Sequence, residues 1–171
     1  MADRNKSIIS AGIGAGIIGG IVMAAFAMMY AGAMGMGFWT PLRLIAAPTS
    51  GVTALIGGGG ILLWGMVIHL MMSAIFGVIL AAILPRRVGN AAGFGWGILY
   101  GIAVWAVMTF LALPVVNSTM QARIALMQGS WFFEHLLFGE VAGTLVPAFR
   151  SKAVSQSPTG EVRQYPERRT A

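Results

Sequence analysis

The 171-residue chain has no cysteine and few charged residues, which account for 9% of it. Without cysteine there are no disulfides, thiolate metal sites or thiol nucleophiles. A soluble domain carries roughly 25% charged residues, whereas this chain is 57% hydrophobic with a mean hydropathy of +0.81. These values predict an integral membrane protein. The net charge of +6 is then expected to orient the protein and to contact anionic lipid, with no nucleic-acid partner.

Motifs of common enzyme classes are also missing. The apolar runs contain no aspartate, no Ser-His-acid order near a nucleophile elbow and no HExxH motif. The glycine run at residues 57–60 lacks the Lys-Ser/Thr that a phosphate-binding loop requires. The sequence therefore does not favour an enzyme.

Four apolar runs are long enough to cross a bilayer, at about residues 8–34, 61–84, 91–113 and 131–149. The first is too long for the apolar core of a signal peptide, and no polar mature segment follows it, so we expect a retained helix. We predict an all-α integral membrane fold, a four-helix transmembrane bundle over residues 1–150. The polar residues that follow are expected to form a disordered cytoplasmic tail, 151–171.

The connections between these runs carry helix-breaking residues. Residues 35–60 contain two prolines and four consecutive glycines, which predict an ordered outer loop with at most an interfacial turn. Pro114 is expected to end the third helix. Asn117 or Ser118 is expected to cap a short amphipathic turn on the surface.

The distribution of basic residues predicts the orientation of the chain. Of the 11 lysines and arginines, only Arg43 and Arg123 fall on the outer side of the predicted helices. All the others fall on the side of the two termini: Arg4, Lys6, Arg86, Arg87, Arg150, Lys152, Arg163, Arg168 and Arg169. This excess predicts a multi-pass protein of the cell inner membrane with both termini in the cytoplasm.

The chain repeats its own pattern. A constant offset of 81 residues aligns two glycine ladders with four-residue spacing: Gly12, Gly16 and Gly20 with Gly93, Gly97 and Gly101. In the second and fourth runs His69-Leu70 matches His135-Leu136, and Phe76-Gly77 matches Phe138-Gly139 only after a gap. The pattern predicts two helix pairs related by an axis along the membrane normal.

The glycine ladders can be explained by helix packing, without a catalytic or binding role. Glycine at every fourth position forms a smooth stripe on which another helix packs closely, as in a glycine zipper. The stripes are expected to pack the bundle internally, and homodimerisation is the alternative. A homo-oligomer or a larger membrane complex remains open, because four helices bury little surface around themselves.

Ionisable residues inside apolar runs are functional-site candidates, because lipid solvates them poorly. Counted from the outer ends of their helices, His69 lies ~12 Å deep and Glu140 ~13–14 Å deep, so the two share a level. We predict a buried polar site of His69, Glu140 and Ser73. His135 lies only ~6 Å deep by the same count and is expected, with Glu134, at the interface.

This polar site leaves three interpretations open. A structural or accessory membrane protein would bury it as a satisfied polar contact, whereas a small transporter or proton-linked channel subunit would use it on an ion path. A haem with axial His69 and His135, or copper bound by His69, Met66 and Met72, is the third. The spacing is not specific for a metal and the two histidines differ in predicted depth, so no cofactor and no metal is predicted.

The order of motifs resembles that of small bacterial inner-membrane proteins of the YagU-like type, uncharacterised four-helix proteins. The similar parts are H-L-x5-F-G at residues 69–77, G-x3-G-x3-W before Leu113-Pro114, and a fourth helix rich in aromatics, Glu and His. The resemblance covers roughly residues 64–147. The chain departs from it in its long Gly-rich first loop and in the order of Glu134 and His135. The resemblance implies location and architecture only.

Overall fold

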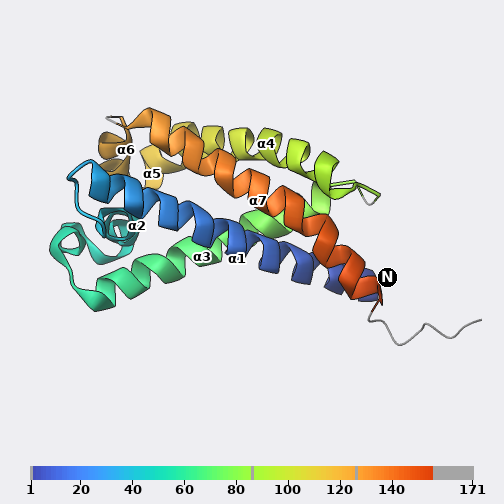
Figure 1. The fold of residues 1–171 in the computed structure, drawn as a ribbon. Helices are drawn as coiled ribbons and strands as arrows, with labels where there is room; N and C mark the ends of the chain where they lie inside the picture. The colour runs from blue at the N-terminus through green and yellow to red at the C-terminus, as the bar shows by residue number, and fades with distance from the viewer. Residues whose placement is uncertain (1, 86, 126, 156–171) are drawn as a thin grey trace, which may run out of the picture.

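The computed structural model describes residues 2–85, 87–125 and 127–155, and within these ranges the regular structure is all helical (Figure 1). This confirms the predicted all-α class. The predicted tail falls largely outside the described residues, and its first part, residues 151–155, belongs to the last helix.

Three helical segments are long and apolar enough to cross a membrane. They are Lys6–Ala33 within α1 (Ala2–Ala33), the whole of α3 (Gly59–Ile83), and Asn90–Val116, which begins with α4 (Asn90–Val107). Three candidate spans indicate a multi-pass membrane protein. The fourth long helix, α7 (Gln128–Ser155), is not among them, because two glutamates and a histidine interrupt its apolar run.

The four long helices form an open layer in the order α3, α1, α7, α4 (Figure 1). Helix α1 packs against α3 and α7, and α7 packs against α4, while α3 makes only sparse contacts with α4 and α7. The two outer helices therefore flank a central pair. The packing of four long helices is consistent with the predicted four-helix bundle, and the fourth membrane span stays a prediction.

The connections contain helices that the sequence analysis did not expect. The first connection contains α2 (Thr40–Ser50) and the 3-10 turn η1 (Val52–Ile56) instead of a loop. Pro41 is tolerated because it stands in the first turn of α2, where its missing N–H has no partner to lose. The α2 helix lies at the end of the layer opposite the N-terminus (Figure 1).

Pro114 does not end the third span, contrary to our prediction. The helix widens into a π-helical turn, η2 (Met108–Ala112), and continues as α5 (Leu113–Val116). Proline removes one helical hydrogen bond and its ring displaces the preceding carbonyls, which a wider turn accommodates. The third span therefore extends to Val116.

Asn117 caps the next helix, α6 (Ser118–Ile124), as predicted. Its side-chain oxygen accepts a hydrogen bond from the Met120 N–H at 3.0 Å. The side-chain amide also donates to the Leu44 carbonyl at 2.9 Å, which ties α6 to α2. Met120 and Ile124 of α6 are buried while Ala122 and Arg123 are exposed, so α6 is a short amphipathic helix at the surface, as predicted, and Asn117 anchors its buried side.

The glycine ladders join the helices of each repeat. A Cβ atom added at Gly16 would overlap the Ser73 carbonyl of α3, and one added at Gly97 would overlap the Gly139 carbonyl of α7. Gly12, Gly93 and Gly101 make similarly close backbone approaches, and a Cβ at Gly20 would meet the Ser73 side chain. The stripes thus pack α1 on α3 and α4 on α7, which is the internal use that we predicted.

These contacts also fix the register of the repeat. Gly12 meets Gly77 and Gly93 meets Gly143, while Gly20 lies beside His69 and Gly101 beside His135. An ungapped offset of 66 residues therefore relates α3 to α7 and pairs the two histidines. The gapped match of the two Phe-Gly pairs was wrong, because Gly77 corresponds to Gly143.

We expect Gly97→Ala to destabilise the protein by ~1–3 kcal/mol, because the added methyl has to push α4 away from the α7 backbone. Gly95→Ala is the matched control on the same helix, since a Cβ there meets nothing within 4 Å. Thermal unfolding in lipid nanodiscs measures both variants. Equal melting temperatures for the two variants would contradict the close packing.

Candidate functional site

A cavity of about 440 Å³ lies among all four long helices near the α2 end of the layer. Helices α1 and α7 supply Met23 and Phe138, while α3 and η2 supply Met72 and Met108 on either side. Helix α2 and Asn117 line its outer end. The lining is almost entirely apolar, apart from a few polar side chains that include both histidines of the chain.

His69 enters this pocket from α3. Its Nε2 lies 2.9 Å from the Gly20 carbonyl oxygen, and since a carbonyl only accepts, Nε2 carries the proton and donates it. Ser73 donates its hydroxyl to the His69 carbonyl at 2.8 Å. The predicted grouping of His69 with Ser73 is therefore a backbone contact, and in the neutral ring Nδ1 keeps a lone pair.

His135 enters the pocket from α7, at the repeat-related position. Its Nδ1 lies 2.8 Å from the Trp131 carbonyl oxygen, so Nδ1 carries the proton in the neutral ring and Nε2 keeps the lone pair. The imidazole stands edge-on to the Trp131 ring, with 4.2 Å between the ring centroids. The Trp131 indole in turn donates to the Thr109 hydroxyl at 2.8 Å, which fixes α7 against η2.

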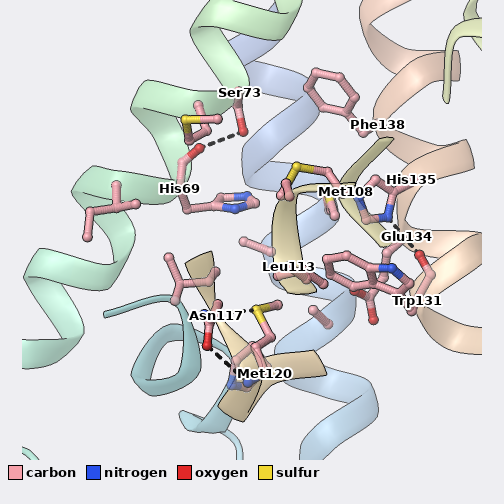
Figure 2. A pocket seen from close by; sticks show the side chains of 18 of the residues that line it. His69, Ser73, Met108, Leu113, Asn117, Met120, Trp131, Glu134, His135 and Phe138 are labelled. Atoms are coloured by element: carbon pink, nitrogen blue, oxygen red, sulfur yellow. Dashed lines mark hydrogen bonds between the residues drawn. The ribbon is translucent and has the colours of Figure 1, made fainter. Parts of the chain in front are cut away.

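The two histidines line one pocket, which sequence depth did not predict. Figure 2 shows their rings on opposite sides of the pocket, with Met108 between them in that view. Counting residues from predicted helix ends had placed them ~6 Å apart in depth. That count was misleading because the two helices do not begin at equivalent positions: His69 lies 10 residues after the start of α3 at Gly59 and His135 lies 7 after the start of α7 at Gln128. The repeat register, and not the distance to the helix end, relates the two histidines.

Glu134 and His135 are buried, not interfacial as we expected. They retain 6% and 3% of their exposed surface, and both line the pocket. The physical reason is that α7 lies between α1 and α4 in the layer, so neighbouring helices cover the half of α7 that carries Glu134 and His135. Within the described residues the Glu134 carboxyl group makes no hydrogen bond or ion pair.

Glu140 lies elsewhere. It is half-buried, it does not line the pocket, and its backbone carbonyl accepts the Thr144 hydroxyl at 2.8 Å. Among the residues that the structure describes, no hydrogen bond or ion pair joins its carboxyl group to His69. The predicted pair of His69 and Glu140 is thus not formed.

Sequence reasoning missed the residues that close the pocket. Met108, Leu113 and Asn117 were assigned to a helix end and a surface turn, yet all three line the cavity. Pro114 was the available signal, because a proline inside an apolar run also marks a widened helical turn. The contacts between α2 and α6 had no sequence signal that we could find.

The donor set does not resemble a site for a hard metal ion. Within the described ranges no group of three or more His, Asp or Glu side chains is placed to hold a metal. Of the methionines considered for copper, Met72 lines the pocket and Met66 does not. The copper ligands considered as an alternative, His69 with Met66 and Met72, are therefore not grouped in the pocket.

Comparisons with known proteins leave the site unassigned. No protein-family model, curated protein or solved structure matches the chain. The resemblance to YagU-like proteins stays a prediction.

The hydrogen bonds of the two histidines predict two different tautomers. At pH 8, where an ordinary histidine is neutral, we expect ¹⁵N solid-state NMR to show one ring protonated at Nε2 and one at Nδ1. The chain has only 2 histidines, so His69→Gln assigns the signals by removing the Nε2–H ring. Two rings protonated at the same nitrogen would contradict the described geometry.

Proposed function

We propose that the chain is a four-span membrane protein that binds an apolar molecule from the bilayer in the pocket around His69, Glu134 and His135. The observation that carries this proposal is the cavity of about 440 Å³, which falls in the usual range of small-molecule sites of ~300–1,000 Å³. Apolar walls with a few convergent polar groups are typical of such sites.

The position of α7 supports a fourth span. Its 28 residues extend ~42 Å, more than a hydrocarbon core of ~30 Å requires. It runs between α1 and α4, and Phe133 is the one large hydrophobic residue of its described part that is exposed. Neighbouring helices therefore solvate its polar groups, which explains why it is less apolar than the lipid-facing helices.

The path of the chain supports the predicted orientation. Helices α1 and α4 begin, and α3 and α7 end, at the same end of the layer (Figure 1). There the Arg150 guanidinium donates to the carbonyls of Ala81, Leu84 and Pro85 at the end of α3. We propose that this basic end lies at the cytoplasmic face of the inner membrane, where it contacts anionic lipid.

The bilayer is the natural source of a ligand. At the inner end of the pocket Tyr100 donates to the Phe76 carbonyl at 2.7 Å, which bridges α4 and α3. At the outer end α2 and Asn117 line the cavity. Between these ends α3 and α4 hardly touch, and their outward faces are apolar: Leu63, Val67, Met71, Ile75 and Ile79 on α3, and Leu99, Ile102 and Val107 on α4.

A binding role is compatible with the accessory and the transport roles that the sequence suggested. An accessory subunit would hold the ligand for a partner, and a transporter would release it on the other side. Homo-oligomerisation, or a place in a larger membrane complex, remains part of the proposal. Ligand binding itself is the step that separates all of these from a purely structural protein.

Photolabelling tests the pocket directly. We expect a diazirine-bearing fatty alcohol, added to the protein in phosphatidylcholine nanodiscs, to label Met108 and Leu113 saturably, as read by peptide mass spectrometry. Ala112→Phe should abolish that labelling because residue 112 lines the cavity. Ala103→Phe is the matched control, since residue 103 is exposed on α4 and outside the pocket.

Labelling confined to outward positions such as Leu99 and Val107, which are 60% and 45% exposed, would contradict the proposed function. Labelling of the pocket that is unaffected by Ala112→Phe would contradict it as well, because the added ring should occupy the cavity.

A further inference from the structure

The hydrogen-bond donors of the side chains that line the pocket are already bonded to other groups of the protein. Besides the two histidines, Ser73 donates to His69, Thr49 donates to the Ala46 carbonyl at 3.1 Å, and the Trp131 indole donates to Thr109. The Asn117 amide donates to the Leu44 carbonyl and to the Met120 sulfur. Among the described polar side chains of the lining, only the Glu134 carboxyl takes part in none of these hydrogen bonds.

What these side chains keep is acceptor capacity. In their neutral rings Nδ1 of His69 and Nε2 of His135 retain lone pairs, and within the described chain no hydrogen bond reaches either atom. The Glu134 carboxylate presents two acceptor oxygens, whereas a protonated carboxyl would also have an O–H to donate. When Glu134 is ionised, the described side chains of the lining therefore keep acceptors for a ligand and no free donor.

Glu134 adds a preference for positive charge. A buried carboxylate is costly unless a cation or donors compensate it. Glu134 is 6% exposed, and its carboxyl group forms no ion pair with a basic side chain of the described residues. A cationic ligand would supply the missing partner, and the Trp131 ring beside it suits a cation as well.

We propose that the pocket binds lipophilic amines in their ammonium form, with the ammonium paired to the Glu134 carboxylate and the alkyl or aryl part among the apolar walls. This inference rests on the proposed function, because it names the ligand class of the same pocket. A primary ammonium carries three donors, and the free lone pairs of His69 and His135 belong to the same lining.

Three probes with the same alkyl chain separate charge from hydrogen bonding. Dodecylamine has both, dodecanol has a donor without charge, and dodecyltrimethylammonium has charge without a donor. Binding is measured by scintillation proximity to the full-length protein in phosphatidylcholine nanodiscs, with empty nanodiscs as background. We expect dodecylamine to bind at least ~tenfold more tightly than either analogue, the equivalent of one charge-assisted hydrogen bond.

Glu134→Gln should remove most of the preference for the amine and leave dodecanol binding nearly unchanged. Glu140→Gln is the matched control, because it makes the same change on the same helix at a position outside the pocket. Should Glu134→Gln fail to fold, the ranking of the three probes on the unaltered protein still decides the proposal.

The outcomes distinguish this inference from the proposed function. If all three probes bind equally and Ala112→Phe blocks them, the pocket binds apolar molecules but the amine assignment is overturned. If dodecyltrimethylammonium matches dodecylamine, the hydrogen-bond argument is overturned. If none binds, the proposed function fails with it. If dodecylamine does not bind, but haemin binds with a bis-histidine spectrum that His69→Gln abolishes, the amine assignment is overturned. The two histidine lone pairs are then ligands of haem iron.

Discussion

Close backbone contact at the glycine ladders is the constraint on which the rest of the structure depends. It brings α1 onto α3 and α4 onto α7 so closely that a methyl group at Gly16 or Gly97 would meet a carbonyl of the facing helix. Lipid provides no hydrophobic drive between helices, so such contact is what holds each pair together. The pairs then join through α1 and α7, which leaves α3 and α4 apart and room for a cavity between them.

The same contact positions the chemistry of the pocket. Gly20 and Gly101 are the last glycines of their ladders, and each lies against a histidine on the facing helix. Because Gly20 has no side chain, the His69 ring reaches the Gly20 carbonyl oxygen and donates a hydrogen bond to it. The protein thus places two imidazoles by repetition of one packing motif, and each is oriented by a backbone carbonyl, as histidines that present a lone pair to a ligand commonly are.

Sequence alone predicted the all-α class, three of the spans, the glycine packing and the Asn117 cap, because these follow from local periodicity and spacing. It did not predict the site. His135 and Glu134 looked interfacial because burial depends on which helices flank α7, and helix order in a layer leaves no local signal. Glu140 looked central for the same reason. Pro114 was interpreted as a stop, since proline chemistry alone does not distinguish a helix end from a π-helical turn.

The Glu134 carboxyl has a consequence for the molecules that the pocket excludes. An uncharged molecule leaves the ionised carboxyl without a partner inside an apolar cavity, which is costly. Such a molecule therefore has to bind to the protonated form of Glu134, whereas a cation binds to the ionised form. The lining thus discriminates by charge without any steric gate.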